Sequence, residues 1–406
     1  MRLFIALLFI FGFQFSVSAQ IFHTPAALVP YLETAPEIIS QAAVLIDAHT
    51  GVILYSKNPD ENIPPASLTK LMTMNLVMKE IKEGRASYDE IIPITVESWA
   101  QSQPYRSSLM FLEPGQTVTL REILLGLAVV SGNDAAVAAA LRLAPTMDDF
   151  AAMMTAEARR MGLSVTRFAE ASGISAQNRT TAAEFASFCR QYLAKHPDSL
   201  KDFHSVQEFS YPLAANEQER YRNNPRTIPQ ENRNTLLKTF PGADGLKTGF
   251  INESGYNVAL SAQRDETRFI LVLLGAPNTR RGARIRDEDG ARLLTWAFDN
   301  FKTVRPLIGS LENARLWKGK LKFAELELAE PADFTSHISR TGSLKYETII
   351  PNPLIAPLAK GEPVGYLKIS DAYGELSRTP LVTKTAYEKG NILKRIWHSI
   401  RLLFKR

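Results

Sequence analysis

Cysteine and histidine are scarce in this chain of 406 residues, which holds one cysteine and six histidines. Cys189 has no second cysteine to pair with, so an intramolecular disulfide is excluded. It lies in the apolar stretch 183–193, which predicts a buried and inert thiol rather than a catalytic one. The histidines are scattered and form no metal-ligand cluster, so we expect neither a metal nor any other cofactor.

Two common catalytic motifs and a long apolar segment are also missing. The sequence has no G-x-S-x-G elbow and no Walker loop. The apolar run from Leu3 to Phe15 has 13 residues, whereas a membrane span needs roughly 20. Arg2 precedes this run, and Val17-Ser18-Ala19 follows it as a small-residue cleavage site. Residues 1–19 are therefore predicted to be a signal peptide, with an uncleaved membrane anchor as the alternative, and we expect the mature protein to be exported.

Acidic residues are absent from the last 16 residues, 391–406, which carry five of the lysines and arginines. Without these five, 42 basic residues balance 42 acidic ones, so the body of the protein is not a basic nucleic-acid binder. On a helical projection, seven apolar residues of this tail fall within an arc of about 140°, and its cations lie opposite. The pattern predicts an amphipathic helix over 389–406 that lies in a membrane interface; a helix docked on its own domain is the alternative.

The middle of the chain has the pattern of an α+β domain. Residues 43–56 read as two strands around a turn, and residues 255–275 read as a hairpin around Asp265-Glu266. Between and after them, helical periodicity occurs at 67–77, 120–140, 147–161, 181–193 and 289–301. Because strands precede and follow a group of helices, we predict an antiparallel sheet with a helical cluster.

From about residue 305 the pattern changes to short strands separated by turn signals. The predicted strands are 316–328, 344–350, 363–369 and 379–385. They predict a small all-β domain, with the boundary between the two domains near 300–306. The organisation is then a catalytic domain over 20–303, an all-β domain over 304–388 and the helix over 389–406.

Ser67-Leu68-Thr69-Lys70 places a serine and a lysine three positions apart at the start of a predicted helix. Positions i and i+3 share a helix face, so the two side chains can approach each other. A serine hydroxyl needs a base to become a good nucleophile, and a lysine serves when burial or a neighbouring cation makes its neutral form accessible. Chance alone gives about one or two such pairs in a chain of this length, so a helix cap beside a surface lysine is the ordinary interpretation.

Two further motifs change that interpretation. Ser131-Gly132-Asn133 follows 64 residues after Ser67, at the end of an apolar stretch, and Lys247-Thr248-Gly249 follows after another 116. An S-x-x-K pair with S-D-N-type and K-T-G motifs is the signature of penicillin-binding proteins and class A β-lactamases. Three motifs in this order and in these settings are improbable by coincidence.

In these motifs the chain resembles the low-molecular-mass penicillin-binding proteins, the serine-type D-alanyl-D-alanine carboxypeptidases (peptidase S11-like). The resemblance covers nearly the whole mature chain and includes 107–112, 133–135, 255–257, 293–296, the trailing β domain and the terminal helix. It implies a β-lactamase/transpeptidase-like catalytic domain. It also implies removal of the terminal D-alanine from peptidoglycan pentapeptide stems, acylation by β-lactams, and anchoring at the periplasmic face of the inner membrane.

The resemblance also implies roles for four residues of the first two motifs. Ser67 would attack the carbonyl of the D-Ala-D-Ala bond and become acylated, with Lys70 as general base. Ser131 would relay a proton to the leaving D-alanine. Asn133 would hold the substrate backbone or Lys70.

The third motif would bind the substrate. Lys247 would attract the terminal carboxylate and favour the neutral form of Lys70 by its positive charge. Thr248 would donate a hydrogen bond to the substrate, and Gly249 would let the substrate approach the strand edge. The backbone N–H groups of Ser67 and Phe250 would form the oxyanion hole.

A carboxypeptidase must also recognise a free carboxylate, a task that suits an arginine. Arg286 matches the family position best. Arg281 and Arg284 are close rivals because the segment 279–286 is rich in arginine, and a solvated basic loop is the non-functional interpretation. Arg233 is a weaker candidate.

The sequence also departs from the family pattern in two places and leaves competing functions open. Phe250-Ile251 stands where family members often have a polar pair, and Ala171-Ser172-Gly173 stands where many have a histidine before the glycine. A class A β-lactamase would need a glutamate for its deacylating water, and no E-x-x-L-N pattern lies between Ser131 and Lys247. A D,D-endopeptidase acting on peptide cross-links would use the same machinery, and a penicillin-binding scaffold would bind with little turnover.

Overall fold

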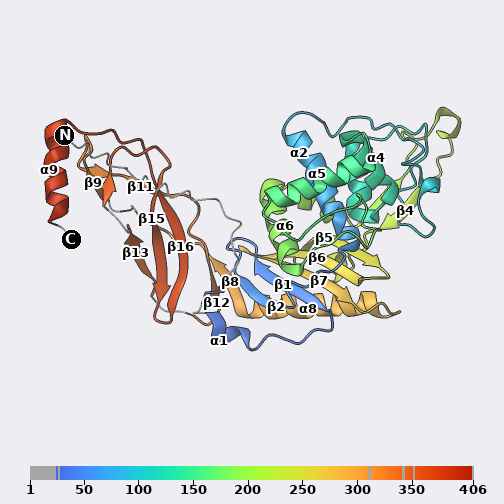
Figure 1. Ribbon diagram of the computed structural model, residues 1–406. Helices are drawn as coiled ribbons and strands as arrows, with labels where there is room; N and C mark the ends of the chain where they lie inside the picture. Colours follow the sequence, from blue (N-terminus) through green and yellow to red (C-terminus); the bar gives the residue numbers. More distant parts are fainter. Residues whose placement is uncertain are drawn as a thin grey trace, which may run out of the picture.

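The computed structural model shown in Figure 1 describes residues 24–25, 28–309, 311, 313–340, 343–350 and 353–404. The predicted signal peptide, 1–19, lies outside the described residues. The described chain forms a large α+β domain and a smaller β domain, and helix α9 stands at the far end of the smaller one (Figure 1).

An antiparallel five-stranded sheet in the order β2-β1-β7-β6-β5 is the centre of the large domain. Its strands are β1 Ala42–Asp47, β2 Ile53–Lys57, β5 Ala243–Ile251, β6 Gly255–Arg264 and β7 Thr267–Ala276. The predicted early strand pair and late hairpin are therefore neighbours in one sheet. β1 and β7 are buried along nearly their whole length because helices cover both faces of the sheet.

One face of this sheet packs on a large helical cluster and the other on α8 and α1 (Figure 1). The cluster holds α2 Lys70–Lys82, α3 Leu120–Leu125, α4 Asn133–Leu143, α5 Met147–Arg160 and α6 Ala182–Lys195. On the opposite side lie α1 Val29–Leu32, the short α7 Leu236–Thr239 and α8 Gly282–Asn300. Cys189 is buried on α6, as predicted, and burial raises the pKa of its thiol, which disfavours the reactive thiolate.

Short helical turns and one small hairpin complete the domain. The turns are Ala66–Thr69, Ala100–Ser102, Gly126–Val130, Leu200–His204 and Glu219–Tyr221, and the hairpin pairs β3 Glu208–Tyr211 with β4 Ile228–Glu231. The single helix predicted over 120–140 is wrong: it breaks after a π-helical turn at Val130 and resumes as α4 at Asn133. The helix predicted over 289–301 starts earlier, since α8 begins at Gly282 and so includes most of the arginine-rich segment 279–286.

The smaller domain consists of two sheets that enclose their own apolar core. One has the order β10-β9-β14, with β9 Ala314–Trp317, β10 Phe323–Ala324 and β14 Leu354–Ile355. The other has the order β11-β16-β15-β13, with β11 Leu326–Leu328, β13 Lys345–Ile349, β15 Pro363–Asp371 and β16 Gly374–Thr383. The predicted strand 316–328 is thus three short strands.

The two domains are joined by a strand pair and by buried hydrogen bonds. β8 Phe301–Val304 follows α8 directly and pairs with β12 Phe334–His337. The Asp47 carboxylate, at the end of β1, accepts hydrogen bonds from the hydroxyls of Thr303 and Thr335, each at 2.9 Å. The junction is therefore anchored in the central sheet.

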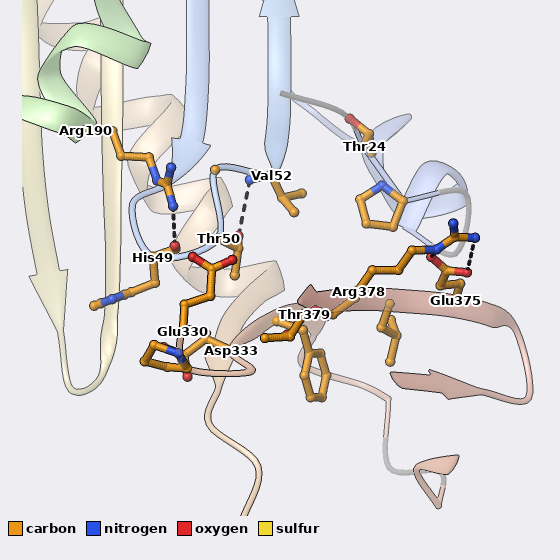
Figure 2. Close-up of a pocket in the computed structure, with 16 residues that line it drawn as sticks. Thr24, His49, Thr50, Val52, Arg190, Glu330, Asp333, Glu375, Arg378 and Thr379 are labelled. Atoms are coloured by element: carbon orange, nitrogen blue, oxygen red, sulfur yellow. Dashed lines mark hydrogen bonds and ion pairs between the residues drawn. The ribbon is translucent and has the colours of Figure 1, made fainter. Parts of the chain in front are cut away.

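A cavity of about 750 Å³ lies at this junction, between the turn that links β1 and β2 and the strand β16 (Figure 2). Arg190 reaches it from α6 and donates hydrogen bonds to the carbonyls of Ala48 and His49, at 2.9 and 2.7 Å. The residues of the three motifs do not line this cavity. The motif residues meet elsewhere, at the sheet edge formed by β5.

Helix α9, Ile392–Leu403, begins at Asn391, whose side chain accepts a hydrogen bond from the Lys394 N–H. It contacts the β domain through polar groups: the Lys394 ammonium donates to the Lys320 carbonyl, and His398 Nδ1 accepts from the Lys318 N–H at 2.7 Å. Its large apolar side chains other than the half-buried Leu402 are exposed, from 43% at Ile400 to 84% at the adjoining Phe404. Among the described residues, no helix combines the length and the apolar character that crossing a bilayer requires.

Candidate active site

Ser67 lies in a tight 3-10 turn, Ala66–Thr69, that leads directly into α2. Two glycines let other segments approach this turn. A Cβ atom on Gly249 of β5 would lie 2.9 Å from the Ser67 nitrogen, and a Cβ atom on Gly173 would lie 1.9 Å from the Ala66 carbonyl oxygen. A side chain at either position would push the neighbouring segment away from the serine. The nucleophile is therefore enclosed by β5 on one side and by the loop around Gly173 on the other.

Lys70 is fully buried one helical turn after Ser67. Its ammonium nitrogen lies 3.1 Å from Ser67 Oγ, 2.8 Å from Asn133 Oδ1 and 2.5 Å from the Ser172 carbonyl oxygen. These partners come from the 3-10 turn, from α4 and from the loop after α5. All three hydrogen-bonding directions of the amine are thus defined, and one of them points at the nucleophile.

Burial lowers the pKa of Lys70 from 10.5 to about 7. The carboxylates of Glu170 and Asp134 act in the opposite direction, and the Arg233 guanidinium lowers the pKa further. The main cause therefore differs from the expected one, because desolvation of the ammonium outweighs any neighbouring cation. A pKa near 7 leaves a large fraction of the lysine neutral at neutral pH, which a general base requires.

Lys247, on β5, is also buried, and its ammonium donates to the Thr248 carbonyl at 3.0 Å. Burial, followed by the charges of Lys70, Arg233 and Arg286, holds the pKa of Lys247 well below its usual value. Four basic side chains, Lys70, Lys247, Arg233 and Arg286, therefore act on one another at this end of the sheet. The two guanidinium groups remain charged and attract a carboxylate, and their charge raises the cost of protonating both lysines together.

Ser131 lies where the π-helical turn Gly126–Val130 ends, in a left-handed conformation with φ of 62°. Its side chain is buried, and its Oγ has no hydrogen-bond partner within the part of the chain that the structure describes. A buried hydroxyl without a partner is costly unless a ligand or a water supplies one. The predicted proton relay through Ser131 needs such an available hydroxyl.

The other K-T-G residues lie along β5, which pairs with β6 so that Thr248 faces Val258 and Gly249 faces Asn257. Thr248 is buried, whereas the Phe250 side chain is 41% exposed and its ring lies 4.4 Å from that of Tyr256. Directly after K-T-G, where family members often have a polar residue, this chain thus places the exposed aromatic ring of Phe250 at the mouth of the site. The role of the Ser67 and Phe250 N–H groups as an oxyanion hole stays a prediction.

The three rival arginines have different surroundings, although all lie at the start of α8. Arg286 is buried, pairs with Asp287 at 2.7 Å and lowers the pKa of Lys247. Arg284 is exposed and pairs with Glu288 one turn further on, and Arg281 is exposed as well. Arg233 is exposed overall, but its Nε lies 3.4 Å from the Val130 carbonyl oxygen and its charge lowers the pKa of Lys70 and Lys247. Of these arginines, Arg286 is the buried one, and the charges of Arg286 and Arg233 both reach the site lysines, whereas Arg281 and Arg284 lie at the surface.

Two carboxylates beside the site were not predicted from the sequence. Asp134 accepts hydrogen bonds from the N–H groups of Met110, Phe111 and Leu112 at 2.8–3.0 Å and so holds one wall of the site. Glu170 holds the opposite loop in the same way. Asp134 follows a motif residue directly, but Glu170 has no sequence signal, since only the fold brings its loop to Lys70.

Across the described ranges, no group of three or more His, Cys, Asp or Glu side chains could hold a metal ion. The site instead combines a hydroxyl, a buried amine of lowered pKa, a second hydroxyl without a partner and several cations. This set is suited to acyl transfer from a substrate that carries a carboxylate.

Comparison with known protein families shows which family this chain belongs to. The sequence model of the D-alanyl-D-alanine carboxypeptidase family, peptidase S11, matches residues 30–278. The chain belongs to this family. A second model, the C-terminal domain of penicillin-binding protein 5, matches residues 306–389. The two models together account for both domains, and the family resemblance inferred from the three motifs is confirmed.

Individual relatives of this S11 chain extend over nearly its full length. D-alanyl-D-alanine carboxypeptidase DacC of Escherichia coli is 30% identical, over 91% of this chain and 90% of the relative. DacA of the same organism is 31% identical, over 91% and 89%. The crystal structure of penicillin-binding protein 5 from Haemophilus influenzae has a TM-score of 0.78 at 29% identity, covering 88% of this chain and 99% of that one. The predicted fold class, with its catalytic and all-β domains, is confirmed.

Proposed function

We propose that this chain is a serine-type D-alanyl-D-alanine carboxypeptidase that removes the terminal D-alanine from peptidoglycan stem peptides. The observation that carries the proposal is the hydrogen bond of 3.1 Å between Ser67 Oγ and Lys70, whose pKa burial lowers to about 7. The sequence relationship supports the same reaction, because relatives that match nearly the whole chain are named D-alanyl-D-alanine carboxypeptidases.

The reaction begins when Ser67 Oγ attacks the carbonyl carbon of the D-Ala-D-Ala bond while its proton passes to the neutral amine of Lys70. The C–N bond then breaks, and the amine of the leaving D-alanine takes a proton by way of Ser131. Water hydrolyses the resulting ester and restores the serine. Asn133 keeps Lys70 oriented through its 2.8 Å hydrogen bond, while Lys247, Thr248 and Arg286 bind the substrate.

A β-lactam would acylate the same serine and stop the cycle at the ester. Intact mass after incubation with penicillin should rise by one adduct, and Ser67→Ala should abolish that adduct. Release of D-alanine from a pentapeptide ending in D-Ala-D-Ala then separates an enzyme from a scaffold. An adduct without D-alanine release would contradict the proposed carboxypeptidase.

A D,D-endopeptidase activity has less support. A D-alanyl-D-alanine endopeptidase of Pseudomonas aeruginosa is 29% identical, but the match covers 64% of this chain and 77% of that relative. A cross-linked dimer of stem peptides serves as the competing substrate. Cleavage of the cross-link faster than removal of the terminal D-alanine would favour the endopeptidase.

For localisation, we propose an exported protein held at the periplasmic face of the inner membrane by α9. The relatives named above come from bacteria, and the cell wall lies outside the cytoplasm. The exposed apolar face of α9 supports the anchor, because this helix contacts its own domain through Lys394 and His398 rather than through that face. Such a helix lies in the interface with its apolar side chains among the lipids.

A further inference from the structure

The loop 169–178 holds the catalytic helix α2 and the turn before it at several points. The Ala171 carbonyl accepts a hydrogen bond from Thr73 Oγ1 at 2.8 Å, and the Ser172 carbonyl accepts one from Lys70 at 2.5 Å. Gly173 packs directly against the peptide that joins Ala66 to Ser67. The position of this loop therefore determines the position of both the nucleophile and its base.

Glu170 organises this loop from within. Its Oε2 accepts hydrogen bonds from Ser172 N at 2.6 Å and from Ser172 Oγ at 2.5 Å. Its Oε1 accepts from Gly173 N at 2.7 Å and from Asn178 Nδ2 at 2.9 Å. The same Asn178 amide lies 3.1 Å from Thr69 Oγ1, which ties the arrangement back to the catalytic turn. Both oxygens of the carboxylate are thus used to fix the backbone that faces Lys70 and Ser67.

The charge of Glu170 also reaches Lys70. The charged groups that face Lys70 are Glu170 from this loop, Asp134 from α4, Arg233 from the segment before α7 and Lys247 from β5. Among the carboxylates that raise the pKa of Lys70, Glu170 has the larger effect. It therefore opposes the effect of burial and keeps the lysine basic enough to accept the serine proton.

We propose that Glu170 is a positioning residue for acylation: its carboxylate fixes the Ser172 carbonyl on Lys70 and the Gly173 backbone against Ser67, and its charge faces the base. This inference rests on the proposed acylation of Ser67. Glu170 does not touch the reacting atoms, and its oxygens are already occupied by the loop. Its contribution is therefore to geometry and to the protonation of Lys70.

Glu184 of α6 provides a matched control. Its carboxylate also accepts several hydrogen bonds from a neighbouring loop, including those from Val165 N at 2.8 Å and Thr166 N at 2.7 Å. It is not among the charges that act on Lys70. Glu184→Gln therefore removes a comparable structural carboxylate without altering the surroundings of the base.

The test measures the second-order rate of acylation by a fluorescent penicillin as a function of pH, with adduct mass and thermal unfolding as companions. Glu170→Gln should lower the maximal rate by about ten- to a hundred-fold, because displacement of catalytic groups by about 1 Å has effects of that order. The midpoint of its acid limb should move to lower pH, since the loss of a negative charge makes Lys70 easier to deprotonate. A loop that merely loosened and admitted water would move the midpoint to higher pH.

Glu170→Asp keeps the charge and loses the reach, so its midpoint should stay near that of the wild type while its maximal rate falls. This variant decides the question if Glu170→Gln does not fold. A wild-type maximal rate in either variant, or a Glu170→Gln midpoint that stays in place or rises, would overturn the inference. Wild-type protein that forms no adduct would instead overturn the proposed function.

Discussion

The side-chain oxygen of Asn133 lies 2.8 Å from the ammonium nitrogen of Lys70, across 63 residues of chain. This contact joins α4 to α2 and turns the base toward Ser67. It exists because the helix predicted over 120–140 is interrupted at Ser131-Gly132, where the break turns the chain and starts α4 at Asn133. A break in a helix is thus the feature that assembles two of the three motifs.

The lowered pKa of Lys70 predicts how acylation depends on pH. The neutral lysine accepts the serine proton, so the rate should rise with pH through a midpoint near 7 and fall below it. Arg233→Gln removes a cation that lowers this pKa, so its midpoint should move to higher pH. Arg233→Lys keeps the charge and should leave the midpoint near that of the wild type. The acylation rate is measured with a fluorescent penicillin over a range of pH. A wild-type midpoint near the usual lysine pKa of about 10.4 would contradict a neutral Lys70.

Arg286 and Arg284 lie two residues apart and offer a matched pair for carboxylate recognition. Arg286→Ala should lower kcat/KM for a pentapeptide by roughly ten- to a hundred-fold, because a hydrogen bond to a charged group contributes about 1.5–3 kcal/mol. Arg284→Ala should have little effect, since Arg284 is exposed and pairs with Glu288. Steady-state release of D-alanine gives both values. Equal losses of kcat/KM in the two variants would contradict a specific role of Arg286 in binding the carboxylate.

The junction between the domains depends on the buried Asp47 carboxylate. Thr335→Val removes a hydroxyl that donates to Asp47 at 2.9 Å, and the loss should be about 1–3 kcal/mol, seen as a lower melting temperature. Burial raises the pKa of Asp47 above 3.8, and the Thr335 hydrogen bond opposes that rise. A raised folded-state pKa favours the fold at low pH, and this contribution is lost as pH rises and Asp47 ionises.

The Thr335→Val destabilisation should therefore be larger at pH 7 than near pH 4, where the protonated carboxyl needs the donor less. Thr348→Val is the control, because Thr348 is exposed on β13. Thermal unfolding at the two pH values measures the difference. Equal shifts at both values would show that the charge of Asp47 does not change between them, against the prediction.

The anchoring helix can be tested by changing one residue on each of its faces. Ile396→Glu places a charge on the exposed apolar face and should release the protein from vesicles that contain anionic lipid. Leu402→Glu adds the same charge on the opposite, half-buried side of the helix and should leave most binding intact. Co-sedimentation with vesicles measures both, and penicillin acylation in solution should be unaffected. Release by both changes alike would count against an oriented interfacial helix.

The sequence alone determined the features that depend on local pattern. Alternating apolar residues and turn signals predicted the two sheet-forming ends of the catalytic domain and the following β domain, and the three motifs identified the family. The amphipathic helix was also predictable, because its periodicity is a local property. The same local reasoning missed the β3–β4 hairpin and the β8–β12 pair, whose strands have only four residues each.

Only the tertiary structure decided how the site is arranged. Burial of Lys70, rather than Lys247, is the main cause of its lowered pKa, and desolvation depends on every segment that covers the amine. Likewise, Glu170 acts on Lys70 through a loop a hundred residues away in sequence, and Arg286 differs from Arg284 because α8 turns one inward and the other to solvent. Motifs indicate which groups are present, whereas distance, burial and charge depend on the packing of segments that are remote in sequence.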